Sequence, residues 1–239
     1  MFARDHHQRI ALVLQMLDGD LLRRNSCLFG GGTAIALSHG EFRESVDMDF
    51  LVSDMTGYRQ LRQLAAGVQG INAFLRESAG TLDRSRDIRA DQYGIRTMLA
   101  VGEHSIKFEI ILEARIRLDT PDPARQICGI STLSERDMVT SKLLANSDRW
   151  NDPSVFSRDL IDLAMMAPKA KILEQAINKA EEAYGECITR DLIKAIDSIQ
   201  ARPDRLERCI KTLKINTPQA AVWQKIRSLK HLIDPERIP

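Results

Sequence analysis

Two aspartates separated by one residue are the strongest chemical signal in the sequence. Asp47 and Asp49 lie in the stretch VDMDFLV, where apolar and polar residues alternate. This alternation predicts a half-buried strand, so both carboxylates should project from the same face. Carboxylates placed side by side can hold divalent cations about 3.5 to 4 Å apart against the phosphates of a nucleotide. The spacing therefore favours a Mg²⁺ or Mn²⁺ site for phosphoryl or nucleotidyl transfer.

A run of glycines before the two aspartates supplies a candidate phosphate site. Gly31, Gly32 and Thr33 precede residues 34–37, which are predicted to form a short helix that stops at Gly40. Backbone N–H groups at the start of a helix bind phosphate oxygens, and glycine leaves these groups uncovered. A triple glycine alone more often marks a loop. Its position directly before a helix favours phosphate binding.

Together these residues resemble the AbiEii toxin family of the DNA polymerase β-like nucleotidyltransferases. A Gly-Gly pair that enters a helix, followed by Asp-x-Asp in a strand, is typical of the superfamily. The stretch FGGGTAIALSHGEFRESVDMDFLV is similar to the GGTAL-like turn and the Arg-x-Ser-x-Asp-x-Asp strand entry of AbiEii proteins. KLLANSDR and SRDLIDL resemble later motifs of the family, so the resemblance covers roughly residues 28 to 163. The 14 residues between Gly32 and Asp47 are slightly more than usual, which leaves the phosphate register open.

Further site residues are implied by the resemblance. Arg43 and Ser45 match the strand-entry motif and would contribute to nucleotide binding. Glu109 would add a third carboxylate from a neighbouring strand, where it would complete the metal site or accept the proton of the acceptor hydroxyl. Lys142 and Asp159 match the later motifs and would act in catalysis, with Lys142 also binding the nucleotide.

Helical spacing places two pairs of these charged residues on shared faces. Lys142 and Arg149 are seven residues apart, or two turns of a predicted helix, and could hold a triphosphate together. Asp159 and Asp162 are three residues apart on the next predicted helix and share a face in the same way.

Structural roles also explain several of these residues. Glu109 could form an exposed ion pair with Lys107 or with a hairpin neighbour. Lys142 could be a surface lysine paired with acidic neighbours, and Arg158 with Asp162 could be a simple i,i+4 helix pair. The sequence leaves these alternatives open.

Apolar periodicity predicts an α+β fold for the amino-terminal half. Helices are expected over residues 10–22 and 58–66. Strands are expected over residues 46–52, 95–101 and 106–112, and the last two should form a hairpin around a polar turn. With the resemblance, these elements imply a polymerase β-like nucleotidyltransferase core with a small mixed sheet.

The pattern changes after Pro121 and Pro123, where strand signals stop and helical repeats follow. Ser134 and Asp137 have the spacing of a capping box at the start of a helix that runs to about Arg149. The second half is therefore predicted to be helical.

Two domains follow from this change of pattern. We expect a nucleotidyltransferase core with an amino-terminal helix over residues 1–125 and a C-terminal helical bundle over residues 126–239. In the second domain, a helix near residues 157–166 should be followed by three more. The residues expected to separate these last helices are Gly185, Pro203 and Pro218.

Composition limits the class of protein more than it identifies one. Lys and Arg total 34 against 33 Asp and Glu, so a nucleic-acid partner would need a local basic patch. The four cysteines show no CxxC pair and no nearby histidines, which argues against zinc and disulfides and fits a reducing cytosol. No apolar run of about 18 residues occurs, and the first nine residues are too polar for a signal peptide. We expect a soluble, cytoplasmic protein without a membrane partner.

The leading hypothesis is an enzyme that moves a nucleoside monophosphate from an NTP, with ATP among the candidate nucleotides, to an acceptor hydroxyl. The resemblance implies that the acceptor is the 3′ end of a tRNA and that the protein is the toxin of a toxin–antitoxin pair with a cognate antitoxin. One alternative is transfer to a protein side chain or a small molecule. Another is an inactive module that binds a nucleotide or a protein, although the clustered carboxylates argue against it.

Overall fold

The computed structural model describes residues 2–233, which divide into two compact units. Within the described residues, the first unit contains residues 2–38 and 45–134. The second unit contains residues 39–44 and 135–233, so a short segment of the amino-terminal half belongs to it. Each unit is described by itself below.

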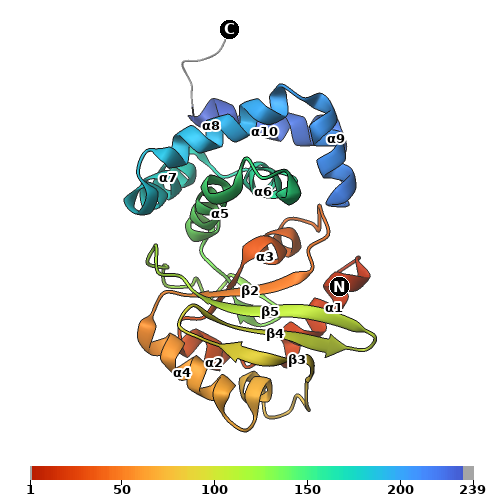
Figure 1. Ribbon diagram of the computed structural model, residues 1–239, viewed down its shortest axis with the longest axis vertical. Helices are drawn as coiled ribbons and strands as arrows, with labels where there is room; N and C mark the ends of the chain where they lie inside the picture. Colours follow the sequence, from red (N-terminus) through yellow and green to blue (C-terminus); the bar gives the residue numbers. More distant parts are fainter. Residues whose placement is uncertain (1, 234–239) are drawn as a thin grey trace. The chain divides into compact units, whose positions relative to one another are not determined.

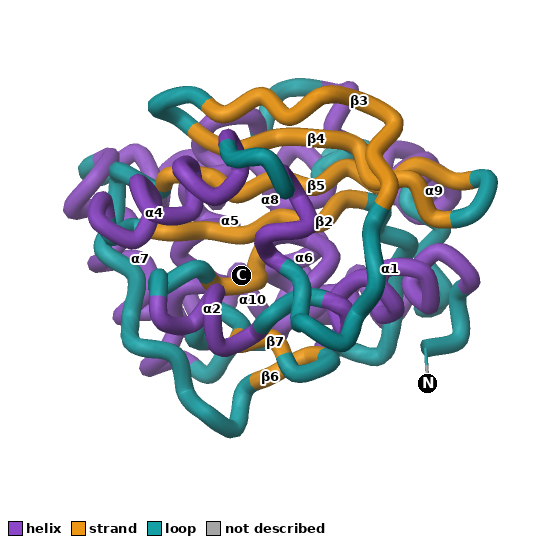
Figure 2. Tube along the Cα trace, turned by 90° about the horizontal axis from the view of Figure 1, so that it is seen from below, coloured by secondary structure: helices purple, strands orange, loops and turns teal. Residues whose placement is uncertain are grey.

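Five strands form a mixed sheet in the first unit, in the order β1-β2-β5-β4-β3. Strands β2, β5, β4 and β3 are labelled side by side in Figure 1 and Figure 2. Strands β2 and β5 are parallel, and all the other neighbours in this sheet are antiparallel. The strands are β1 (Leu28–Gly30), β2 (Asp47–Val52), β3 (Asp83–Ala90), β4 (Gly94–Val101) and β5 (His104–Leu112).

One face of this sheet builds a hydrophobic core. The rings of Phe29, Phe50, Phe108 and Phe74 form a continuous series, with centroids 5.2, 5.3 and 6.4 Å apart, and all four side chains are fully buried. Burial of each such side chain stabilises the fold by roughly 2 to 3 kcal/mol, and tilted ring pairs add to this. Because side chains alternate along a strand, the opposite face is left for polar residues.

The single helix predicted over residues 10–22 is wrong, because the chain bends between two shorter helices. The Asp18 side chain accepts hydrogen bonds from the backbone N–H groups of Asp20 and Leu21, and this cap starts a new helix. Apolar periodicity continues across the break and therefore hides it. The helices of the first unit are α1 (Asp5–Met16), α2 (Gly19–Arg24), α3 (Gly31–Ser38), α4 (Met55–Ala66) and the 3₁₀ helix η1 (Gly70–Phe74).

Two strand regions escape the sequence prediction. Strand β3 has the sequence DRSRDIRA and lies at the edge of the sheet, mostly exposed, so no apolar alternation marks it. The second region is the pair of strands β6 (Gln126–Ile127) and β7 (Ile130–Ser131) in the first unit, which lies beyond Pro123. Strands of two residues are too short to carry a periodic signal.

Helices build the second unit, apart from residues 39–44. Helix α5 packs against α6, α7 and α8, and α10 packs against α6. Within residues 2–233, four helices follow α6, one more than predicted, because three separating residues delimit four segments that are each long enough for a helix. The elements are α5 (Glu135–Arg149), η2 (Pro153–Val155), α6 (Arg158–Met166), α7 (Ala170–Tyr184), α8 (Cys187–Gln200), α9 (Pro203–Thr212) and α10 (Gln219–Ile233).

Backbone hydrogen bonds attach residues 39–44 to the turn between α9 and α10. The Glu44 N–H donates to the Leu213 carbonyl at 3.2 Å, and the Asn216 N–H donates to the Phe42 carbonyl at 2.9 Å. These bonds hold the segment as part of the second unit. In the described part of the chain, no helix is both long enough and apolar enough to cross a membrane.

Candidate active site

Strand register places three carboxylates on the polar face of the first unit's sheet. In the parallel pair of β2 and β5, Asp47 lies opposite Lys107, and Asp49 lies opposite Glu109. Residues that are directly opposite project from the same face, and so do residues two apart along one strand. Met48, between the aspartates, is fully buried on the other face. The prediction that Asp47 and Asp49 share a face is confirmed.

The turn between β1 and α3 brings the glycine run against Asp49. Gly31 has a φ of +67°, and a Cβ atom built on it would lie 2.5 Å from Asp49 Oδ2. Only glycine fits there, because it tolerates positive φ and has no Cβ. Gly31 and Gly32 are the first two residues of α3, where backbone N–H groups have no carbonyl partner within the helix. The candidate phosphate site therefore adjoins a candidate metal ligand.

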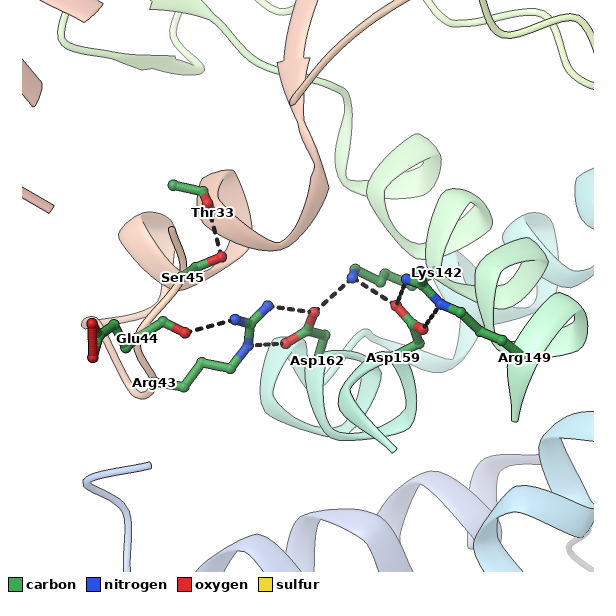
Figure 3. A network of polar contacts seen from close by, with 8 residues as sticks. All are labelled: Thr33, Arg43, Glu44, Ser45, Lys142, Arg149, Asp159 and Asp162. Carbon is green, nitrogen blue, oxygen red and sulfur yellow. Dashed lines mark hydrogen bonds and ion pairs between the residues drawn. The ribbon is translucent and has the colours of Figure 1, made fainter. Parts of the chain in front are cut away.

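Thr33 and Ser45 fix α3 onto the start of β2. Thr33 is buried, and its hydroxyl oxygen lies 2.8 Å from Ser45 Oγ (Figure 3). The same oxygen lies 2.5 Å from the Asp47 carbonyl oxygen. The backbone N–H of Ser45 donates to Nε2 of the fully buried His7 at 3.1 Å, which requires the proton of that neutral ring to sit on Nδ1. These contacts position Asp47. Roles of Thr33 and Ser45 in nucleotide binding stay predictions.

Glu109 is held by two cations. Arg96 Nε donates to Glu109 Oε1 at 3.0 Å, and the Lys107 ammonium pairs with Oε2. Burial by itself lowers the pKa of Lys107, but Glu109, Asp47 and Asp49 raise it by more, so it lies above its ordinary value. The ion pair that the sequence allowed is therefore present.

The carboxylates do not form a closed metal cage. Among residues 2–233, no group of three or more His, Cys, Asp or Glu side chains has a geometry that could hold a metal ion. Asp47 and Asp49 lie two residues apart on β2 and therefore project from one face, and Glu109 shares its oxygens with Arg96 and Lys107. The role of Glu109 as a metal ligand or base stays a prediction.

A network of five charged residues lies in the second unit (Figure 3). Arg43 binds Asp162 through Nε at 2.7 Å and a terminal nitrogen at 2.9 Å. Lys142 Nζ lies 2.7 Å from Asp162 Oδ2 and 2.8 Å from Asp159 Oδ1. Arg149 donates two hydrogen bonds to Asp159, at 2.7 and 3.1 Å. Each carboxylate therefore has two cationic partners, one of them a bidentate arginine.

Burial makes these charges depend on one another. Four of the side chains are less than 10% exposed, and Arg149 is 35% exposed. Burial by itself raises the pKa of each aspartate, but Lys142 with Arg149 lowers that of Asp159 by more, and Arg43 with Lys142 does so for Asp162. Burial also lowers the pKa of Lys142, and the two carboxylates raise it by more. All five groups stay charged at neutral pH, with one positive charge in excess.

The predicted shared faces are confirmed by these contacts. Lys142 and Arg149 both reach Asp159, and Asp159 and Asp162 both reach Lys142. A surface position for Lys142 is wrong, since its side chain is 7% exposed. Whether Lys142 and Asp159 act in catalysis stays a prediction.

The partners of Asp162 are what the sequence does not reveal. The expected i,i+4 pair with Arg158 does not account for it, because its partners are Lys142 and Arg43, the latter 119 residues away. The match of Arg43 to a nucleotide-binding motif was the only available signal at that position. Its guanidinium contacts Asp162 and the Glu44 carbonyl, and a role in nucleotide binding stays a prediction.

Two solved structures from Helicobacter pylori have a similar fold. One is described as a candidate nucleotidyltransferase; it is 16% identical, with 97% of this chain and 94% of that chain covered and a TM-score of 0.53. The other, JHP933, is 18% identical, with 99% and 94% covered and a TM-score of 0.54. At these identities the likeness concerns the fold alone. A search of curated proteins finds no match.

The mixed sheet, with two aspartates on one face beside a glycine turn, defines a nucleotidyltransferase core. The sequence profile described as "Nucleotidyl transferase AbiEii toxin, Type IV TA system" matches residues 15–228, which is most of the chain. The chain belongs to this family and is a nucleotidyltransferase.

Proposed function

We propose that the protein transfers a nucleoside monophosphate from an NTP to an acceptor hydroxyl, with Asp47 and Asp49 holding Mg²⁺ or Mn²⁺. The observation that carries this proposal is the strand register, which sets both aspartates on one face with Gly31 against Asp49. Mg²⁺ is usually bound through one or two carboxylates together with substrate phosphates. A pair of carboxylates therefore fits a metal that arrives with its nucleotide, without a third protein ligand.

In the proposed reaction, the acceptor hydroxyl oxygen forms a bond to the α-phosphorus. The bond from this phosphorus to the bridging oxygen breaks, and pyrophosphate leaves with the electron pair, while the hydroxyl proton passes to a base or to water. Bound divalent cations supply charge neutralisation at the phosphates. The N–H groups of Gly31 and Gly32 donate hydrogen bonds to phosphate oxygens, and the cation of Lys107 adds positive charge on the same face.

The proposed acceptor is the 3′ end of a tRNA, and the proposed context is the toxin of a toxin–antitoxin pair. The toxin–antitoxin context is supported by the family description, which names a type IV toxin–antitoxin system. A cognate antitoxin protein would then be the partner that opposes the activity.

Labelled nucleotides test this proposal directly. Purified protein would be incubated with Mg²⁺, total tRNA and each α-labelled NTP in turn, and the products separated on a gel. We expect label on RNA with the wild type and no label with the double variant Asp47→Asn, Asp49→Asn. Asp20→Asn is the matched control, because Asp20 is an exposed carboxylate of the same unit, paired with Arg23.

Each outcome separates one part of the proposal from another. Transfer that survives in the double variant would rule out the aspartate pair as the metal site. If the label appears on protein or on a small molecule, that molecule is the acceptor in place of tRNA. The assignment of the metal site to Asp47 and Asp49 would still hold. Binding of Mg-NTP without any product would favour an inactive nucleotide-binding module.

A further inference from the structure

A cavity lined by cationic side chains lies in the second unit, and none of its lining residues belongs to the five-residue network. Its volume is about 330 Å³. Three arginines line it: Arg202, Arg205 and Arg208. Arg205 and Arg208 are three residues apart on α9, and Arg202 immediately precedes this helix.

The charged side chains that line this cavity are all cationic. No carboxylate lines it in the described part of the chain. Arg208 pairs with Asp204 at 3.0 Å, but both side chains are about 70% exposed, so water screens this pair. The three guanidinium groups line one cavity and repel one another, although water screens this repulsion as it screens the ion pair. An anion in the cavity would relieve this repulsion.

An aromatic wall completes the cavity. Phe156 and Pro153 line it together with the arginines. Arginine forks grip phosphate oxygens, and an aromatic ring offers a face on which a nucleobase can stack. A volume of about 330 Å³ is large enough for more than a phosphate ion. The lining therefore fits one nucleotide unit, with a phosphate and a base.

The backbone is strained at Phe156, the aromatic residue of the cavity lining, and at Ser157. Phe156 and Ser157 are consecutive residues with φ values of 51° and 50°, in the left-handed region that non-glycine residues rarely adopt. Such strain costs about 1 to 3 kcal/mol per residue and tends to occur at functional sites. Ser157 is buried and forms a hydrogen bond with Cys209, which lines the cavity. The two residues immediately precede α6, which carries Asp159 and Asp162.

We infer that this cavity binds a nucleotide unit through its phosphate and base. Arg202, Arg205 and Arg208 hold the phosphate, and Phe156 stacks on the base. The bound nucleotide is either part of an RNA strand or free, since both present a phosphate and a base. If the nucleotide is part of an RNA strand, the cavity binds the acceptor. This assignment rests on the proposed function.

Binding measurements on the full chain in EDTA test the inference, because they require neither metal nor catalysis. Titration calorimetry would compare AMP, inorganic phosphate and adenosine. We expect AMP to bind more tightly than either part alone. The double variant Arg202→Ala, Arg208→Ala should weaken AMP binding at least tenfold, and Phe156→Leu should bring it to the level of phosphate.

A matched control separates the cavity from general charge effects. The double variant Arg190→Ala, Arg227→Ala removes two arginines of the same unit that do not line the cavity. It should bind AMP like the wild type. Equal losses in the two arginine double variants, or unchanged binding in both, would overturn the inference.

Fluorescence anisotropy with a short single-stranded RNA in EDTA distinguishes the two sources. Weaker RNA binding in Arg202→Ala, Arg208→Ala, but not in Arg190→Ala, Arg227→Ala, assigns the cavity to an RNA strand. Loss of AMP binding with unchanged RNA binding assigns it to a free nucleotide. Both results stand even if the labelling experiment shows no transfer, so failure of the proposed function is detected separately.

Discussion

Asp162 is fully buried and binds two cations at once. A carboxylate in such a position is tolerated only if its oxygens are satisfied, because removing a charge from water costs several kcal/mol. The fork of Arg43 covers both oxygens, and Lys142 adds a second contact to one of them. Asp162 thereby joins residues 39–44 to α5 and α6.

Replacement of Asp162 by asparagine should destabilise the protein strongly. The amide keeps the shape but removes the negative charge, which leaves Arg43 and Lys142 buried with one carboxylate fewer. Removing one partner of a buried ion pair typically costs about 3 to 5 kcal/mol, and we expect a value near the lower end. The free energy of unfolding would be measured by urea titration.

Asp197→Asn is the control for that measurement. Asp197 pairs with Lys230 at 2.7 Å in the same unit, but its side chain is 54% exposed. An exposed pair contributes about 0 to 1 kcal/mol. Equal losses of stability in Asp162→Asn and Asp197→Asn would show that the buried network does not anchor the fold.

The pH dependence of stability follows from the same carboxylates. The pKa values of Asp159 and Asp162 lie below their ordinary value of 3.8 in the folded protein. Their contribution to stability is therefore complete above about pH 4 and is lost as the pH falls through the folded values. Urea midpoints at pH 7, 5, 4 and 3 should fall more steeply below pH 4 in the wild type than in Asp162→Asn. Parallel curves would contradict this assignment.

At the residue scale, sequence spacing predicts which side chains share a face but not what that face meets. Asp47 with Asp49, and Lys142 with Arg149, follow from strand and helix periods. The partnership of Arg43 and Asp162, which are 119 residues apart, depends on tertiary folding and leaves no mark in local spacing.

At the scale of elements, the turn from β1 into α3 determines the geometry around Asp49. Gly30 pairs with Asp49 across the two strands, and Gly31 then reverses the chain with a φ of +67°. The first residue of α3 is thereby held close to the Asp49 carboxylate. This arrangement depends on glycine at one position more than on the rest of the run.

Gly31→Ala should reduce transferase activity much more than Gly102→Ala. Both glycines have positive φ, at +67° and +60°, so alanine should cost about 1 to 2 kcal/mol at either position. Only at Gly31 would the new Cβ meet Asp49, whereas nothing lies within 4 Å at Gly102. Displacing a ligand by about 1 Å can cost roughly 100-fold in rate. Initial rates of labelled transfer would measure the difference, and equal rates in the two variants would exclude a role for this contact.

Some elements could be predicted from the sequence, and others could not, for identifiable reasons. Strands β2, β4 and β5 bury one face and carry the expected alternation. Strand β3 lies at an edge and places Arg84 and Arg86 in solvent, so its pattern resembles that of a loop. The break between α1 and α2 depends on the single cap at Asp18, which a continuing apolar period conceals.

At the scale of the whole molecule, each unit has its own core, and its unfolding can be followed by a signal of its own. Both tryptophans, Trp150 and Trp223, lie in the second unit, so tryptophan fluorescence follows the unfolding of that unit. The first unit contains no tryptophan, and hydrogen exchange of the amides in β2 and β5 reports on it. A ligand that binds one unit can therefore be assigned by which signal it changes.

Binding of Mg-NTP should protect the strands that carry the aspartates. A ligand at 100 times its Kd stabilises the folded state by about 2.7 kcal/mol, which corresponds to roughly 100-fold slower exchange of amides that open by unfolding of the unit. We expect this protection in β2 and β5 of the wild type and its loss in Asp47→Asn, Asp49→Asn, with Asp20→Asn behaving like the wild type. Hydrogen–deuterium exchange with mass spectrometry would measure it at a fixed nucleotide concentration, with and without Mg²⁺. The double variant lacks both proposed metal ligands. Protection that persists in this variant would therefore show that groups other than the aspartate pair hold the nucleotide.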